Sequence, residues 1–177
     1  SDVQTQVDRS IAYEKNPSQG WNGYQKGILI ASNQGPGDDN EMDWAHARHL
    51  YNDLLGFGYS EVEEFYDGTH SGGTDSSGNP SSSTIKQAIN DGVGIIHYTG
   101  HGSRTTWSTS GFNVSSVNSL TNSVLPFVCT VGCVTGDFMY SSSACLAESF
   151  LWATYNDQPS GAVASFMSTV FQQWDPP

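Results

Sequence analysis

Short, continuous apolar runs alternate with helical patterns along this chain, and this alternation limits the folds that it can adopt. Four runs have the length of a buried strand: KGILIAS, GIIHY, PFVCTV and GAVASFM, at 26–32, 94–98, 126–131 and 161–167. Runs that are apolar throughout are typical of parallel strands covered on both faces. A fifth segment, 61–67, alternates apolar and polar residues, which predicts a strand near an edge of the sheet.

Helical periodicity fills the segments between these runs. It predicts helices over about 2–13, 41–55, 82–90, 114–120 and 144–155. In the first helix, Val3, Val7 and Ile11 form one apolar stripe, and Gly56 suits the C-cap of the second. Strands that alternate with helices favour right-handed crossovers. The sequence therefore predicts one α/β domain over 1–177, with a mostly parallel sheet between two helical layers.

Charge and composition argue against several classes of protein. The 177 residues include 6 basic and 18 acidic side chains, which gives a net charge of −12. So few Lys and Arg residues disfavour binding to nucleic acids or to anionic membranes. No apolar run approaches the roughly 18 residues that a membrane-spanning helix needs. An acidic chain rich in small polar residues favours a secreted or bacterial cell-surface protein.

The three cysteines are an odd number, so at least one of them has no partner within the chain. Cys129 lies inside an apolar strand and Cys145 opens an apolar helical face, and both positions favour the core. His97 also lies within a strand, where we expect a core histidine. Cys133 differs from these residues because it follows the end of the strand 126–131.

A histidine and a cysteine follow the ends of two successive predicted strands. His101 lies in TGHGS, after the strand 94–98, and Cys133 lies in GCVTGDF, after the strand 126–131. Ligands bind at the carboxyl ends of parallel strands, and neighbouring strands lie about 5 Å apart. If these two strands are neighbours, thiol and imidazole form a nucleophile with its base.

The glycines beside His101 suggest a place for an oxyanion. Gly100 and Gly102 allow a sharp turn, and the N–H groups of Gly102 and Cys133 can point at a common spot. Packing is the alternative, because a cysteine at a strand end is often buried and a histidine between glycines often lies in a turn. The spacing by itself leaves both interpretations open.

The same residues resemble the gingipain family of bacterial cysteine peptidases. The resemblance rests on YTGHGS and CVTGDF, and it extends to DVQTQVDRSIAYEKN, ILIASNQGPGDDNEMDWAH and SFMSTVFQQWDPP. It implies a caspase-like α/β/α sandwich, with Cys133 as the nucleophile and His101 as the catalytic base. The implied reaction is hydrolysis of peptide bonds through a thioester acyl-enzyme, with no cofactor needed for catalysis.

In this family an acid from the loop after an earlier strand orients the histidine. Here that loop contains Asp38, Asp39, Glu41 and Asp43. Asp38 is preferred and Asp39 comes next, because both lie near the end of the strand. For Asp43, in the first helical turn, interaction with the helix dipole is the better interpretation. For Asp38 the two interpretations are evenly balanced.

The resemblance also bears on substrate and metal. Gingipains prefer a basic side chain at the cleavage site, which Asp175 would suit, whereas Phe171 and Trp174 would suit an apolar one. The family is known for structural calcium, but the resemblance assigns no ligands here. Oxygen ligands are offered by the 38–43 loop and by Asp67, Asp75 and Asn79, although a solvated acidic loop is the simpler interpretation.

The family's catalytic domain begins before the first predicted helix and continues beyond WDPP. We therefore expect this chain to be the central part of a longer catalytic domain, associated with its flanking sequence or with a second processed chain. Two alternatives to an endopeptidase stay open. One is a sortase-like transpeptidase of the same family, which passes the thioester to an amine, and the other is a non-catalytic α/β binding module.

Overall fold

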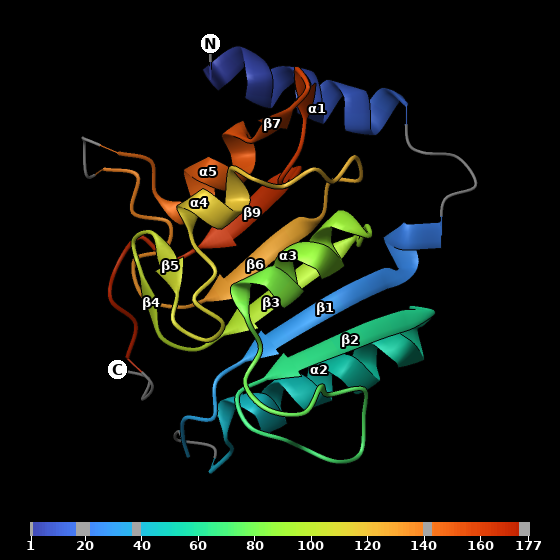
Figure 1. The fold of residues 1–177 in the computed structure, drawn as a ribbon, viewed down its shortest axis with the longest axis vertical. Helices are drawn as coiled ribbons and strands as arrows, with labels where there is room; N and C mark the ends of the chain where they lie inside the picture. Colours follow the sequence, from blue (N-terminus) through green and yellow to red (C-terminus); the bar gives the residue numbers. More distant parts are fainter. Residues whose placement is uncertain (1, 17–21, 37–39, 140–142, 174–177) are drawn as a thin grey trace.

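A five-stranded sheet forms the centre of the computed structural model, which describes residues 2–16, 22–36, 40–139 and 143–173. The strands are β1 (Lys26–Ala31), β2 (Glu61–Tyr66), β3 (Ile95–Thr99), β6 (Phe127–Val131) and β9 (Ala164–Met167), in the order β2-β1-β3-β6-β9. Every neighbouring pair is parallel, so the five arrows of Figure 1 point the same way. The predicted parallel sheet is confirmed, and so is the edge position of the strand 61–67.

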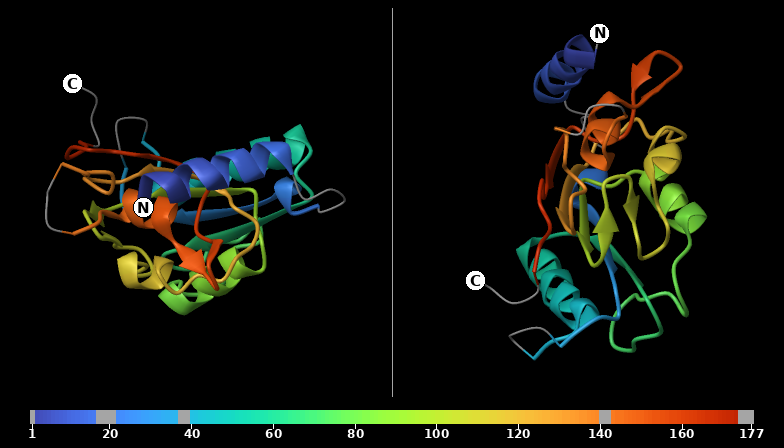
Figure 2. Two further views of the ribbon diagram at one scale, coloured as in Figure 1. Left: turned by 90° about the horizontal axis from the view of Figure 1, so that it is seen from above. Right: turned by 90° about the vertical axis from the view of Figure 1, so that its left-hand side faces the viewer.

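The strands β6 and β9 keep exposed apolar side chains, so they are not covered on both faces as the sequence predicts. Helices pack on each face of the sheet. They are α1 (Asp2–Lys15), α2 (Asp43–Phe57), α3 (Ser82–Asn90), α4 (Val114–Val117) and α5 (Leu146–Trp152), with a short 3₁₀ helix, η1 (Asn22–Gln25), before β1. Figure 2 shows α2 on one face of the sheet and α3 and α4 on the other. Two small hairpins complete the chain, β4 (Gly102–Ser103) with β5 (Thr106–Trp107) and β7 (Thr154–Tyr155) with β8 (Gln158–Pro159). No described helix is long and apolar enough to cross a membrane.

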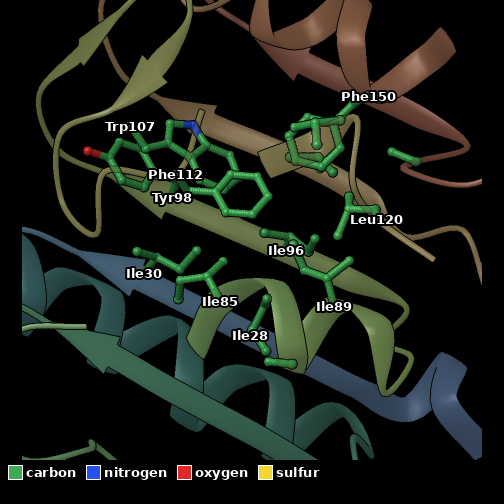
Figure 3. Close-up of a cluster of buried hydrophobic side chains, with 14 of the residues drawn as sticks. Ile28, Ile30, Ile85, Ile89, Ile96, Tyr98, Trp107, Phe112, Leu120 and Phe150 are labelled. Carbon is green, nitrogen blue, oxygen red and sulfur yellow. The ribbon is translucent and has the colours of Figure 1, made fainter. Parts of the chain in front are cut away.

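The larger hydrophobic core lies between the sheet and the helices α3, α4 and α5 (Figure 3). Aromatic side chains fill its end near the β4–β5 hairpin. The indole of Trp107 stacks on Tyr98 with ring centroids 5.0 Å apart and on Phe112 at 5.3 Å. A smaller core, which includes Leu29 and Val62, lies under α2.

The ends of three helices differ from those that the sequence predicts. The C-cap of α2 is Gly58, not Gly56, because Gly58 has a left-handed φ of 116° and its N–H bonds the carbonyl groups of Leu54 and Leu55. α5 stops at Trp152, since Ala153 is its C-cap and Thr154 and Tyr155 then pair with β8 in a hairpin. α4 is a single turn with a capping box at Asn113. These endings depend on backbone conformation and pairing that apolar periodicity does not report.

The first helix docks through a buried charge and leaves its apolar stripe exposed. Val3, Val7 and Ile11 share a face, as predicted, but they are 71%, 46% and 45% exposed. Arg9 is instead 1% exposed, and its guanidinium donates hydrogen bonds to four carbonyl oxygens. The acceptors belong to Phe150, Ala153, Ser160 and Ala162, at 2.8, 2.8, 3.0 and 2.5 Å. The guanidinium thus satisfies carbonyl groups at the end of α5.

Candidate active site

His101 and Cys133 follow two strands that are neighbours in the sheet. Thr99 and Val131 are register partners in β3 and β6, and His101 and Cys133 each lie two residues beyond that pair. The N–H of Gly100 also bonds the carbonyl oxygen of Val131 at 3.0 Å. The pairing of these two strands, on which the sequence argument depends, is therefore present.

Two glycines let the loops that follow β3 and β6 pack backbone against backbone. A Cβ atom on Gly102 would lie 3.1 Å from the carbonyl oxygen and 3.4 Å from the amide nitrogen of Cys133. A Cβ atom on Gly132 would lie 3.1 Å from the carbonyl oxygen of Gly100. The two distances of 3.1 Å are tighter than most contacts of a real Cβ atom, so the close approach of the loops favours glycine at both positions.

The thiol of Cys133 is half-buried and lies against the backbone of Gln172. The N–H of Gln172 is 3.4 Å from Sγ, and Sγ is 3.5 Å from the carbonyl oxygen of the same residue. The next residue, Val134, has a φ of 50°, which is rare for a β-branched side chain. Its N–H bonds the carbonyl oxygen of Val170 at 3.0 Å, so the segment after β9 holds this turn in place.

The surroundings of the other two cysteines disfavour the thiolate form. Cys145 is fully buried at the start of α5, as predicted, whereas Cys129 in β6 is only half-buried. Burial raises the pKa of both thiols, which lowers their thiolate fraction at neutral pH. All three cysteines are free, so no disulfide competes with a role for Cys133.

The backbone of His101 is fixed by two hydrogen bonds to its carbonyl oxygen. The hydroxyl group of Tyr98 donates one at 2.5 Å, and the N–H of Ser108 donates the other at 3.0 Å. The imidazole is solvent-exposed and borders a polar cavity of about 370 Å³. The lining residues besides His101 are Ser32, Asn33, Gln34, Asp67, Gly68, Asn79, Ser108 and Thr109.

Asp67 is the one acidic residue among the described residues that line this cavity. It follows the last residue of β2, and its carboxylate accepts a hydrogen bond of 2.8 Å from the hydroxyl group of Thr109. Sequence reasoning gave Asp67 no role in catalysis and did not consider Tyr98 or Thr109. The only signals were the position of Asp67 at a strand end and that of Tyr98 just before TGHG.

Several residues chosen from the sequence lie outside the described residues. They are Asp38 and Asp39, proposed to orient the histidine, and Trp174 and Asp175, proposed to bind substrate. Asp43 is described. It lies in the first turn of α2, as predicted, and its carboxylate accepts a hydrogen bond from the hydroxyl group of Ser32.

Side chains hold the long polar loop after β2 in a defined conformation. Both carboxylate oxygens of Asp75 accept backbone N–H groups, from Tyr66 at 3.1 Å and from His70 at 2.8 Å. The imidazole of His70 also stacks on Trp44 of α2, with centroids 4.0 Å apart. Among the described residues no group of three or more His, Cys, Asp or Glu side chains could hold a metal ion. These bonds fix the carboxylate of Asp75 against the backbone. A structural calcium ion stays a prediction.

The parallel sheet, with a histidine and a cysteine at neighbouring strand ends, is the architecture of a caspase-like cysteine peptidase. The family model described as peptidase family C25 matches residues 1–175. The chain therefore belongs to peptidase family C25, as the resemblance implied.

Proteins of known structure and curated relatives agree with this assignment. Gingipain R2 and gingipain R1 from Porphyromonas gingivalis are 39% identical over 179 residues, which are 99% of this chain and 23% and 17% of theirs. The crystal structure of the Arg specific cysteine proteinase gingipain R (RgpB) superposes with a TM-score of 0.87. This structure is 36% identical in sequence, and the match covers 98% of our chain and 38% of the chain in that structure. The complex of the RgpB pro- and mature domains gives the same TM-score. The chain thus spans less than half the length of these relatives.

Proposed function

We propose that this chain carries the nucleophile and the base of a cysteine endopeptidase. The thiol of Cys133 transfers its proton to His101, and the thiolate attacks the scissile carbonyl carbon. His101 returns the proton to the leaving amine as the C–N bond breaks, and water then hydrolyses the thioester. The observation that carries the proposal is the register of Thr99 with Val131. Because these residues pair at the ends of neighbouring strands, His101 and Cys133 both lie two residues beyond the same pair.

The backbone next to these residues supports an oxyanion site. Gly102 and Cys133 are the proposed donors, because the backbone of Gly102 lies against the amide nitrogen and carbonyl oxygen of Cys133. Two N–H groups from adjacent loops stabilise the negative oxygen of a tetrahedral intermediate without reorganising during the reaction.

Asp38 remains our proposal for the acid that orients His101, with Asp39 as the alternative. An orienting acid positions and polarises the imidazole but does not react, so its loss costs less turnover than loss of His101. We expect His101→Ala to lower kcat by several orders of magnitude and Asp38→Asn to give an intermediate loss. Asp43→Asn is the matched control, and equal, small effects at both acids would leave Cys133 and His101 as a dyad.

For the substrate we propose a basic side chain at the cleavage site, recognised by Asp175, with Trp174 in the same pocket. The relative described as Arg specific supports this choice. The alternative is an apolar side chain packed on Trp174 and Phe171. Peptidyl chloromethyl ketones that end in Arg, Lys, Leu or Phe separate these possibilities, because the reaction rate ranks the side chains and mass spectrometry locates the adduct.

The adduct also tests the proposed function itself. We expect it on Cys133, fastest with the Arg reagent, and absent from Cys133→Ala. Labelling of Cys129 or Cys145 at the same rate would overturn the assignment. Hydrolysis of a peptide substrate in the presence of an added amine must give a free carboxylate, whereas an amide product would identify a transpeptidase.

Exposed apolar side chains on β6 and β9 support association with another segment of polypeptide. Phe127, Val131 and Phe166 lie on β6 and β9 and are 41%, 37% and 71% exposed. Apolar patches of this kind mark interaction surfaces. We propose that flanking sequence, or a second processed chain, covers this face in a secreted or cell-surface protein. Light scattering of residues 1–177 alone should show association, and a monodisperse, fully active monomer would contradict the proposal.

A further inference from the structure

We propose that Tyr98 is a positioning residue for His101, because its buried hydroxyl group ties the histidine loop to Asp67 through Thr109. This inference rests on the proposed function, since it assigns a role within the same active site. It concerns how the base is held in place, and it adds no group to the chemical steps themselves.

The hydroxyl group of Tyr98 joins two backbone positions on either side of the β4–β5 hairpin. It donates to the carbonyl oxygen of His101 at 2.5 Å and accepts from the N–H of Thr109 at 3.2 Å. Tyr98 is fully buried, and burial raises its pKa to about 12, so the hydroxyl keeps its proton at neutral pH. It is therefore a permanent donor to the backbone of His101.

Thr109 extends the connection to the edge of the sheet. Its hydroxyl group donates to the carboxylate of Asp67 at 2.8 Å, and only 3% of Thr109 is exposed. The N–H of Asp67 in turn bonds the carbonyl oxygen of Ala31 at 2.9 Å, which fixes Asp67 at the end of β1. The series Asp67, Thr109, Tyr98 and His101 thus runs from the end of β2 to the proposed base.

The ring of Tyr98 also lies beneath both catalytic loops. A Cβ atom on Gly100 would lie 3.0 Å from the hydroxyl oxygen of Tyr98, and one on Gly132 would lie 3.3 Å from its ring. The ring is also stacked on Trp107, with the planes 7° apart (Figure 3). The ring therefore has little freedom to move, and its hydroxyl group holds the carbonyl group of His101 in a fixed position.

Loss of this hydroxyl group should displace the imidazole. The carbonyl oxygen of His101 would lose its bond from Tyr98 and keep the one from the N–H of Ser108, and the N–H of Thr109 would lose its buried acceptor. Without these two bonds the loop that carries His101 is held less firmly. A displacement of about 1 Å at a catalytic group can cost about 100-fold in rate. The expected effect therefore falls on turnover more than on substrate binding.

The test is Tyr98→Phe in the full-length protein that contains this chain, with Tyr66→Phe as the matched control. Tyr66 is equally buried, but its hydroxyl group bonds Glu64, outside the series that ends at His101. We expect Tyr98→Phe to lower kcat about 10- to 100-fold. Here kcat is expressed per active site, and active sites are counted by titration with a chloromethyl ketone. We expect KM to change less than about twofold, and Tyr66→Phe to keep the wild-type kcat while losing stability.

A second variant covers the case in which Tyr98→Phe does not fold. Thr109→Val keeps the backbone bond to Tyr98 but removes the bond to Asp67, so its kcat should fall, and Thr109→Ser should restore it. A wild-type kcat per titrated site in Tyr98→Phe, or in Thr109→Val if only that variant folds, would overturn the inference and leave the proposed function intact.

Alkylation of Cys133 by iodoacetamide provides a readout that needs no peptidase activity. In the wild-type protein the rate across pH 5 to about 9 should depend on His101, as a comparison with His101→Ala shows. That dependence should shrink in Tyr98→Phe if the hydroxyl group positions the imidazole. An undiminished dependence would overturn the inference, whereas a wild-type protein that alkylates but hydrolyses nothing would overturn only the proposed function.

Discussion

The backbone of Gly102 lies against that of Cys133, so closely that a Cβ atom on Gly102 would be 3.1 Å from the carbonyl oxygen of Cys133. It would also be 2.8 Å from the methyl carbon of Thr135, which is fully buried. The loop that carries the proposed base and the loop that carries the proposed nucleophile thus meet without an intervening side chain. Their separation is set by the absence of a side chain at Gly102.

Gly102→Ala should therefore separate the two loops. We expect kcat/KM to fall about 10- to 100-fold, since a displacement of about 1 Å at a catalytic group has an effect of that size. Gly56→Ala is the control, because Gly56 lies in α2 and a Cβ atom there meets nothing within 4 Å. Peptidase assays with urea unfolding on both variants check the prediction, and a fully active Gly102→Ala would contradict it.

Cys133 and Cys129 should differ in their effect on peptidase activity, and loss of either thiol should cost little stability. Cys133→Ala should abolish peptidase activity and change the free energy of unfolding by less than about 1 kcal/mol, because the thiol is only half-buried. Cys129→Ala should keep most of the activity and should also cost less than about 1 kcal/mol, because this thiol is half-buried as well and not in the core as the sequence predicts. Activity assays and urea unfolding of the two variants measure both effects. If the two phenotypes were exchanged, Cys129 would be the nucleophile.

His97 should make the folded state sensitive to acid. Burial, with a smaller effect of His46, lowers the pKa of His97 to about 4, and the imidazole bonds the hydroxyl group of Thr99 at 2.7 Å. Between pH 6.5 and 4 the unfolded chain binds a proton at His97 that the folded chain excludes, so stability falls as pH falls. The loss should reach at most about 3 kcal/mol.

Urea unfolding at pH 7, 5.5 and 4 measures this loss for the wild-type protein and for His97→Gln. The substitution should remove most of the pH dependence in this range, because Gln does not titrate. His49→Gln is the control, since His49 is exposed beside Glu41 on the surface of α2. Equal slopes for all three proteins would show that His97 is not the group responsible.

Arg9 should be essential for the docking of α1. Its guanidinium donates to four carbonyl oxygens while it is almost fully buried, so Arg9→Met should cost about 3 kcal/mol or more. Arg9→Lys should restore little of this, because one ammonium group cannot reproduce the planar fork of donors. Lys15→Met, in the last turn of the same helix, is the control and should be nearly neutral. Thermal unfolding ranks the variants, and a neutral Arg9→Met would refute the prediction.

Local patterns in the sequence determine most of the fold and single out the two residues proposed for catalysis. The apolar runs at β1, β3, β6 and β9 predict strands of a parallel sheet, and all four are present. The expectation that they are buried on both faces is wrong for β6 and β9, which are exposed on one face. His101 and Cys133 follow two of these runs, and parallel strands bring their carboxyl ends to one edge. Here the sequence is sufficient because the chemistry lies within a few residues of the elements that position it.

Only the tertiary structure determines which surfaces are buried and which distant residues meet. The periodicity of α1 identifies an apolar stripe, but the helix packs through Arg9, whose four acceptors lie more than 140 residues away in the chain. The link from Asp67 through Thr109 and Tyr98 to His101 joins the end of β2, a loop and β3. No local spacing encodes such contacts, because they form only when the sheet brings together segments that are far apart in the sequence.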